Sequence, residues 1–138
     1  MSSKLIGVDF GLSKIGLSIS DPSKIISIPL KVVRYKTKAE LLNILNEIAM
    51  ENDVDTFVVG YPLNMNNEKN EMTELVEQFK ADLQEMNFKV YLQDERLSSE
   101  SAKKIIQQQN IKTGENKEKI DLIASTIILQ SFLDKGVA

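Results

Sequence analysis

A chain of 138 residues with 42% apolar and 27% charged side chains is ordinary for a globular protein and long enough for one stable core. It contains no cysteine and no histidine, which excludes disulfides, thiol nucleophiles, Cys/His zinc sites and histidine general bases. Any catalysis must use carboxylates, Lys, Ser, Thr or Tyr, or a hard metal ion held by oxygen ligands, which suits Mg²⁺ or Mn²⁺. The net charge of −3 argues against non-specific coating of nucleic acid. It still allows a nuclease whose acidic site is neutralised by metal.

No apolar run approaches the length of a membrane span. Met1–Lys4 leads directly into an apolar segment without the pattern of a signal peptide. We therefore expect a cytoplasmic protein of one domain, residues 1–138, with no membrane partner.

The N-terminal segment predicts a β-hairpin with strands at Leu5–Asp9 and Ile15–Ser20 and a turn around Gly11. In the second strand, apolar residues alternate with small ones, which is typical of a strand with two distinct faces. Asp9 is a carboxylate where a buried strand would otherwise continue. It is either a solvated strand end that starts the turn, or a group that holds a cation or faces a phosphate, since burying an unpaired charge is costly.

The next elements alternate between strands and helices. A third extended segment within Ile25–Tyr35 contains Pro29, which favours an edge strand. Thr37 is a plausible N-cap for a helix from Lys38 to about Glu51. The segment Val54–Gly60 is a nearly continuous apolar run, as expected for a central parallel strand.

The second half continues the alternation and ends in helices. The periodicity predicts four further elements before the last helix: a helix from about Glu68 to Met86, a strand at Phe88–Gln93, a helix from Ser98 or Ser99 to about Gln108, and a mobile polar loop at Gln109–Lys117. The final helix is expected at about Glu118–Asp134. This order predicts one mixed sheet, antiparallel on its hairpin side and parallel on its crossover side, with helices on both faces.

Acidic side chains follow the strands whose carboxyl ends should meet. Asp9 ends the first strand, Asp94-Glu95 ends the fifth, and Asp121 opens the last helix, which can pack across that edge. Each has a simpler explanation, because Asp94-Glu95 could pair with Arg96 and Asp121 could be a first-turn acid favoured by the helix dipole. A cluster of carboxylates repels itself unless cations lie among them. Two divalent ions would provide those charges and a route to phosphodiester hydrolysis.

Four motifs in this order resemble the YqgF/RuvX family of bacterial proteins, described as pre-16S rRNA nucleases and as Holliday junction resolvases. The matching segments are Asp9-Phe10-Gly11 with Lys14-Ile15-Gly16, Val59-Gly60-Tyr61-Pro62-Leu63-Asn64-Met65, Asp94-Glu95-Arg96-Leu97-Ser98-Ser99, and Asp121 with the segment Ile127–Asp134. The resemblance implies an α/β, RNase H-like fold. In that fold a five-stranded mixed sheet has the order 3-2-1-4-5, strand 2 is antiparallel, and helices cover both faces.

The resemblance also implies an activity and residue roles. It implies a Mg²⁺- or Mn²⁺-dependent nuclease of the two-metal type, acting on structured nucleic acid in 5′-end maturation of pre-16S rRNA during ribosome biogenesis. The implied catalytic and metal-binding acids are Asp9, Glu95 and Asp121. The residues implied to lie near substrate phosphates are Lys14, Asn64 and Arg96, the last because its planar fork suits an oxyanion.

Two groups of basic residues are candidates for nucleic-acid contact. Lys112, Lys117 and Lys119 flank the expected mobile loop beside Asp121, which favours RNA contact there. A second group surrounds the third strand and is explained at least as well by a solvated surface: Lys31, Arg34, Lys36 and Lys38.

Three alternatives remain open from the sequence. The chain could be an actin-like or sugar-kinase-like ATP-binding domain, although only one phosphate loop is visible. It could be a Holliday junction resolvase-like nuclease acting on branched DNA. It could also be a non-catalytic nucleic-acid or ribosome-assembly binding module. A monomer or weak homodimer is expected for the nuclease.

Overall fold

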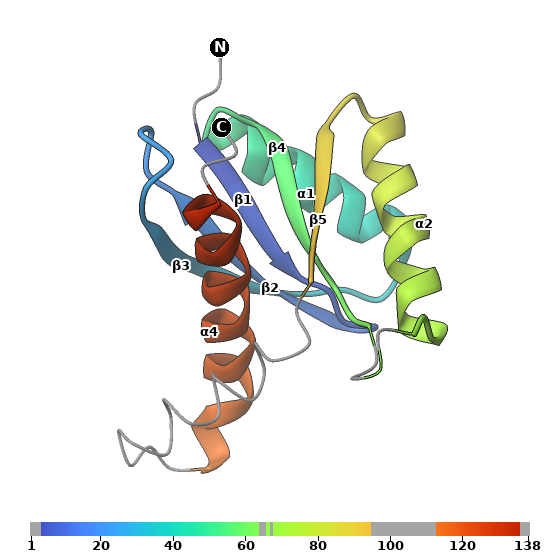
Figure 1. The fold of residues 1–138 in the computed structure, drawn as a ribbon. Helices are drawn as coiled ribbons and strands as arrows, with labels where there is room; N and C mark the ends of the chain where they lie inside the picture. The colour runs from blue at the N-terminus through green and yellow to red at the C-terminus, as the bar shows by residue number, and fades with distance from the viewer. Residues whose placement is uncertain (1–3, 64–65, 67, 95–112, 136–138) are drawn as a thin grey trace.

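The computed structural model describes residues 4–63, 66, 68–94 and 113–135 (Figure 1). The helix expected from Ser98 or Ser99 to Gln108 lies outside these residues, as does the first part of the expected mobile loop. No helix in the described part of the chain is long and apolar enough to cross a lipid bilayer.

The described strands form one five-stranded sheet in the order β3-β2-β1-β4-β5. β1 pairs with β4 and β4 with β5 in parallel, whereas β2 is antiparallel to both of its neighbours. The expected order 3-2-1-4-5 is therefore confirmed, with Pro29 on the edge strand. The strands are β1 (Lys4–Asp9), β2 (Lys14–Ser20), β3 (Ser27–Arg34), β4 (Val54–Tyr61) and β5 (Lys89–Asp94).

Helices cover both faces of this sheet (Figure 1). α1 (Lys38–Glu51) and α2 (Glu71–Glu85) pack on one face, where the larger hydrophobic core lies, and α4 (Thr113–Asp134) packs on the other face over a second cluster. α1 begins where expected, because the Thr37 side chain accepts a hydrogen bond from the Glu40 amide at 3.2 Å.

Two helix starts differ from the sequence prediction. α2 begins at Glu71 rather than near Glu68, because Asn70 and Thr73 form a capping box. The last helix begins at Thr113 rather than Glu118, so the prediction of a loop through Lys117 was wrong for residues 113–117. This polar segment has no apolar stripe, and the sequence pattern therefore contained no signal for it.

Side chains along β1 alternate between the two faces, as strand geometry requires. Ile6 and Val8 belong to the core under α1 and α2, whereas Leu5 belongs to the cluster under α4. The same alternation assigns Asp9 to the α4 face. Phe10 lies on the opposite face, where its ring contacts Phe79 of α2.

Candidate active site

Asp9 is the last residue of β1, at the edge where the parallel strands end. Its register partner in β2 is Gly16. It is half-buried and interacts with another residue of the chain, so it is not a freely solvated strand end. The structure therefore places Asp9 at the sheet edge that the sequence predicted.

Asp121 reaches the same edge from α4. A Cβ atom on Gly16 would lie 2.3 Å from the Asp121 carbonyl oxygen and 3.1 Å from the Asp121 Cβ atom. The helix can approach this closely only because position 16 has no side chain. Since Gly16 is also the register partner of Asp9, the two acids flank the same glycine.

The position of Asp121 within its helix corrects one interpretation. The sequence placed it in the opening turn, but α4 begins at Thr113 and Asp121 lies in its third turn. The stabilising effect of a helix dipole on an acid is confined to the first turn. The helix dipole therefore does not explain a carboxylate at this position.

A hydrogen-bonded contact fixes α4 one turn beyond Asp121. Ser125 donates from its hydroxyl to the Gly7 carbonyl at 2.9 Å, and the Ser18 hydroxyl donates to the Ser125 carbonyl at 2.8 Å. Both serines are fully buried. The small residues that the sequence placed on one side of the second strand thus form the surface on which α4 docks.

Lys14 forms an ion pair with Asp121. The distance between Lys14 Nζ and Asp121 Oδ2 is 3.0 Å, and each side chain is about a quarter exposed or less, at 26% and 22%. Oδ2 itself is shielded from solvent and accepts no well-aligned hydrogen bond from the described residues. The contact is therefore electrostatic. Lys14 was expected near substrate phosphates, and in the structure its ammonium forms an ion pair with one of the candidate acids.

Gln93 is a polar residue on the same face that was not among the residues predicted from the sequence. It is only 6% exposed, and its Oε1 atom has no hydrogen-bond partner in the described part of the chain. Its register partner is Gly60. The ring of Tyr91, two residues earlier, lies against the ring of Phe132 in α4, with centroids 5.1 Å apart and an interplanar angle of 39°. A polar residue at an inward position just before a strand end was the only available signal.

A second polar cluster fixes the chain where β4 ends. The Tyr61 hydroxyl donates to Glu77 Oε1 at 2.5 Å, and Lys69 Nζ lies 3.2 Å from the same oxygen. The hydrogen bond from Tyr61 is the main reason that the pKa of Glu77 is lowered, and it raises the pKa of Tyr61. Asn70 also donates to the Pro62 carbonyl at 2.8 Å. The segment after β4 is thereby tied to α2.

The structure brings together three of the predicted site residues: Asp9, Lys14 and Asp121. Among the described residues no group of three or more acids is close enough to hold a metal ion. Lys119 is exposed in the second turn of α4. Lys117 belongs to α4, but its side chain is not described. The remaining predicted site residues lie outside the described residues: Asn64, Glu95, Arg96 and Lys112.

Solved structures identify the class of this fold. The chain is similar to Thermus thermophilus RuvC in complex with a Holliday junction substrate, with a TM-score of 0.58, 11% identity, and coverage of 97% of this chain and 96% of that one. It is also similar to the fowlpox virus Holliday junction resolvase, with a TM-score of 0.57, 14% identity, and coverage of 97% and 99%. The chain therefore has the RNase H-like fold of these resolvases.

Sequence comparison then gives the family. A family model described as "RuvX: Holliday junction resolvase" matches residues 3–135, and this chain belongs to that family. A Mycoplasmopsis synoviae protein named "Putative pre-16S rRNA nuclease" is 41% identical over 94% of this chain and 96% of its own length. A protein of the same name from Ruminiclostridium cellulolyticum is 35% identical, with coverage of 96% and 94%.

Proposed function

We propose that this protein is a divalent-metal-dependent nuclease that hydrolyses phosphodiester bonds in structured RNA, with pre-16S rRNA as its substrate. The observation that carries the proposal is the arrangement of Asp9 and Asp121, which flank Gly16 on one face of the sheet. The relatives named as pre-16S rRNA nucleases cover nearly the whole chain and support the choice of substrate.

The described side chains fit a hard divalent cation. Asp121 Oδ2 is shielded from solvent, lies beside a cation and accepts no hydrogen bond from the described residues, so it retains the capacity to bind a metal. Carboxylate oxygens are the ligands that Mg²⁺ and Mn²⁺ prefer. We propose Glu95 as the third acid, because it directly follows the last residue of β5.

Each proposed site residue then has a role in the reaction. Divalent metal ions, when bound, would supply an activated water and stabilise the leaving oxygen. Asp9, Glu95 and Asp121 would hold these cations, and Lys14 neutralises Asp121 before substrate arrives. We assign phosphate binding to the remaining predicted residues: Asn64, Arg96, Lys112, Lys117 and Lys119.

The direct test compares Asp9→Asn with the wild type in processing of a pre-16S rRNA fragment. The amide keeps the shape of the side chain but removes its charge. We expect the cleavage rate constant to fall about a hundredfold or more, because a lost electrostatic contact to the transition state has this cost. Asp55→Asn is the matched control, since Asp55 is exposed at the opposite end of the sheet and its Oδ1 atom accepts a hydrogen bond from Thr56 Oγ1 that an asparagine side chain can also accept.

Three outcomes distinguish the candidate functions. Equal processing by wild type and Asp9→Asn would show that the enzyme proposal is wrong. Metal-dependent cleavage of a four-way DNA junction, with no cleavage of RNA, would favour the second candidate, a branched-DNA nuclease, which the description of the matching family suggests. Tight RNA binding without turnover would leave a non-catalytic binding module.

A further inference from the structure

A cavity of about 300 Å³ opens on the α1 and α2 face, directly behind the candidate active site. Phe10 forms part of its wall and immediately follows Asp9 in the chain. The cavity and the two candidate acids therefore lie on opposite faces of the same sheet edge. A volume at the lower end of the range for ligand pockets suits a single flat ring.

The lining of this cavity is aromatic. Phe10 and Phe79 contact each other with ring centroids 4.8 Å apart and an interplanar angle of 36°. The Tyr35 hydroxyl donates to the Gly11 carbonyl, so its ring lines the cavity while its polar end holds the β1–β2 loop. A tyrosine phenol is neutral and a hydrogen-bond donor at physiological pH, and burial raises the pKa of Tyr35 further above its ordinary value.

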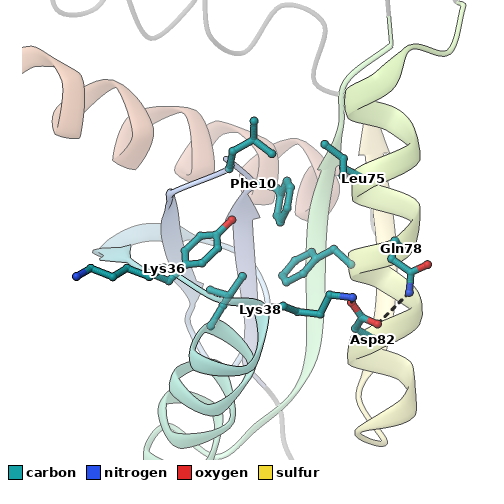
Figure 2. Close-up of a pocket in the computed structure, with 10 residues that line it drawn as sticks. Phe10, Lys36, Lys38, Leu75, Gln78 and Asp82 are labelled. Atoms are coloured by element: carbon teal, nitrogen blue, oxygen red, sulfur yellow. Dashed lines mark hydrogen bonds and ion pairs between the residues drawn. The ribbon is translucent and has the colours of Figure 1, made fainter.

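Large apolar side chains at the cavity remain uncovered. Leu12 is 68% exposed and Leu75 is 42% exposed. Figure 2 shows Phe10 and Leu75 at one end of the cavity. Exposed leucines beside an aromatic wall indicate a surface that gains stability when a flat apolar ligand covers it.

The other end of the cavity is polar and basic. Lys38 Nζ lies 3.2 Å from Asp82 Oδ2, and Gln78 donates to Asp82 Oδ1 at 3.0 Å (Figure 2). Lys36 is exposed, extends outward from the rim and makes no ion pair with the described residues. An aromatic wall with hydrogen-bonding groups and an available ammonium matches the three parts of a nucleotide: ring face, ring edge and phosphate.

We propose that this cavity binds the base of an unpaired nucleotide in the RNA strand that is cleaved. The base lies against the aromatic wall, and Lys36 binds a phosphate of the same strand. This inference rests on the proposed function, because it assumes an RNA strand whose reacting phosphate is at Asp9. It adds a substrate class: RNA with an unstacked nucleotide beside the cleaved bond, rather than continuous duplex.

The test measures binding of a short single-stranded RNA that contains 2-aminopurine, by fluorescence anisotropy in EDTA so that no cleavage occurs. Phe10→Leu keeps an apolar side chain against Phe79 but removes the ring. We expect single-stranded RNA to bind about fivefold more weakly or worse, because stacking on an aromatic ring contributes on the order of 1 kcal/mol or more per base. Binding of a fully paired RNA duplex should not change. Quenching of 2-aminopurine on binding should be lost.

A second variant tests the phosphate contact and does not disturb the core. Lys36→Ala should reduce the slope of log affinity against log salt by about 0.7, the value for one phosphate contact on a single strand. The controls are Tyr91→Leu, a half-exposed aromatic residue on the other face, and Lys89→Ala, an exposed lysine at the start of β5. Neither control should change RNA binding.

The results also separate this inference from the proposed function. Unchanged binding by Phe10→Leu, or an equal loss on duplex RNA, would overturn the base-binding cavity and leave the nuclease proposal intact. Absence of wild-type binding to single-stranded RNA would overturn it as well. If Asp9→Asn processes RNA normally but the ring-dependent binding is found, the catalytic proposal fails and the cavity stands.

Discussion

At the scale of single residues, the central feature is the ion pair between Lys14 and Asp121. A pair that is about three-quarters buried contributes modestly to stability, because its Coulomb energy is offset by desolvation. Its larger effect concerns the charge at the candidate site. The Lys14 ammonium lies against the Asp121 carboxylate oxygen that a divalent cation would bind. Lys14 and a metal ion therefore compete for Asp121.

This competition predicts the effect of Lys14→Gln on metal binding. Removal of one positive charge beside the acids should tighten Mn²⁺ binding about three- to tenfold, the scale of a screened interaction with a divalent ion at this range. Isothermal titration calorimetry measures the dissociation constant directly. Lys89→Gln, at the far end of the sheet, is the control and should have no effect. Unchanged or weaker Mn²⁺ binding by Lys14→Gln would contradict the competition.

A second carboxylate, Asp21, stabilises the turn between β2 and β3. Its Oδ1 atom accepts from the Ile26 and Ile25 amides, each at 2.8 Å, and these hydrogen bonds lower its pKa below the ordinary 3.8. A lowered pKa in the folded state means that the stabilisation is present above pH 3.8 and is lost as pH falls through the folded pKa.

Asp21→Ala should therefore be less stable than the wild type at neutral pH, and the difference should shrink as the solution is acidified below about pH 4. Urea unfolding at a series of pH values gives the two free energies of unfolding. Glu47→Ala is the control, because the Glu47 side chain is exposed on α1 and makes no hydrogen bond or ion pair with the described residues. A difference that stays constant with pH would show that the Asp21 carboxylate is not responsible.

At the scale of elements, the docking of α4 determines where Asp121 lies. Glycines and serines on β1 and β2 allow the helix to approach, and Ser125 hydrogen-bonds to the sheet. The sequence revealed the small face of β2 but not what packs on it, because a contact between residues 18 and 125 has no local signal. The start of α4 was likewise hidden by its polar first turns, whereas Thr37 gave the start of α1 correctly.

Two glycine substitutions separate positioning of the site from general stability. Gly16→Ala would place a methyl group 2.3 Å from the Asp121 carbonyl oxygen. Gly7→Ala would place one 2.4 Å from Ser18 Oγ and 2.7 Å from the Leu129 Cβ, so its contacts with α4 begin one turn beyond Asp121, at the Ser125 carbonyl. Both should destabilise the fold by about 1–3 kcal/mol through overpacking. Gly16→Ala should additionally weaken Mn²⁺ binding about tenfold or more, because a shift of α4 at this point displaces a proposed ligand.

Thermal unfolding and Mn²⁺ titration of both variants give the comparison. If Gly7→Ala weakens Mn²⁺ binding as strongly as Gly16→Ala, the effect is a general loss of packing. In that case the close contact at Gly16 has no special role in positioning Asp121.

At the scale of the whole molecule, the candidate chemistry lies at one end of the sheet. The carboxyl ends of β1, β4 and β5 and the first half of α4 lie at this end, whereas the β2–β3 turn, the α2–β5 turn and the end of α4 lie at the other (Figure 1). The sequence predicted this polarity, since parallel strands must end at one edge. It could not supply Lys14 as the partner of Asp121, or Gln93 as a buried amide, because both depend on distant packing.

The proposed RNA-binding role of Lys112, Lys117 and Lys119 is a property of the whole charge distribution. Their joint replacement by Ala should reduce the slope of log affinity against log salt by about 2, since each phosphate contact on a single strand contributes about 0.7. The control replaces Lys24, Lys89 and Lys135, which lie at the opposite end of the sheet. Their replacement removes the same amount of positive charge. An unchanged slope in the first variant would refute the proposed contact, and an equal reduction in both would indicate only net charge.

Anomalous scattering from a crystal soaked in Mn²⁺ is the most direct test of the proposed metal site. We expect a peak bonded to carboxylate oxygens of both Asp9 and Asp121 at about 2.1 Å, with Glu95 completing the acidic ligands. A well-ordered crystal with Mn²⁺ bound elsewhere, or with the Asp9 and Asp121 carboxylates directed away from a common ion, would contradict it.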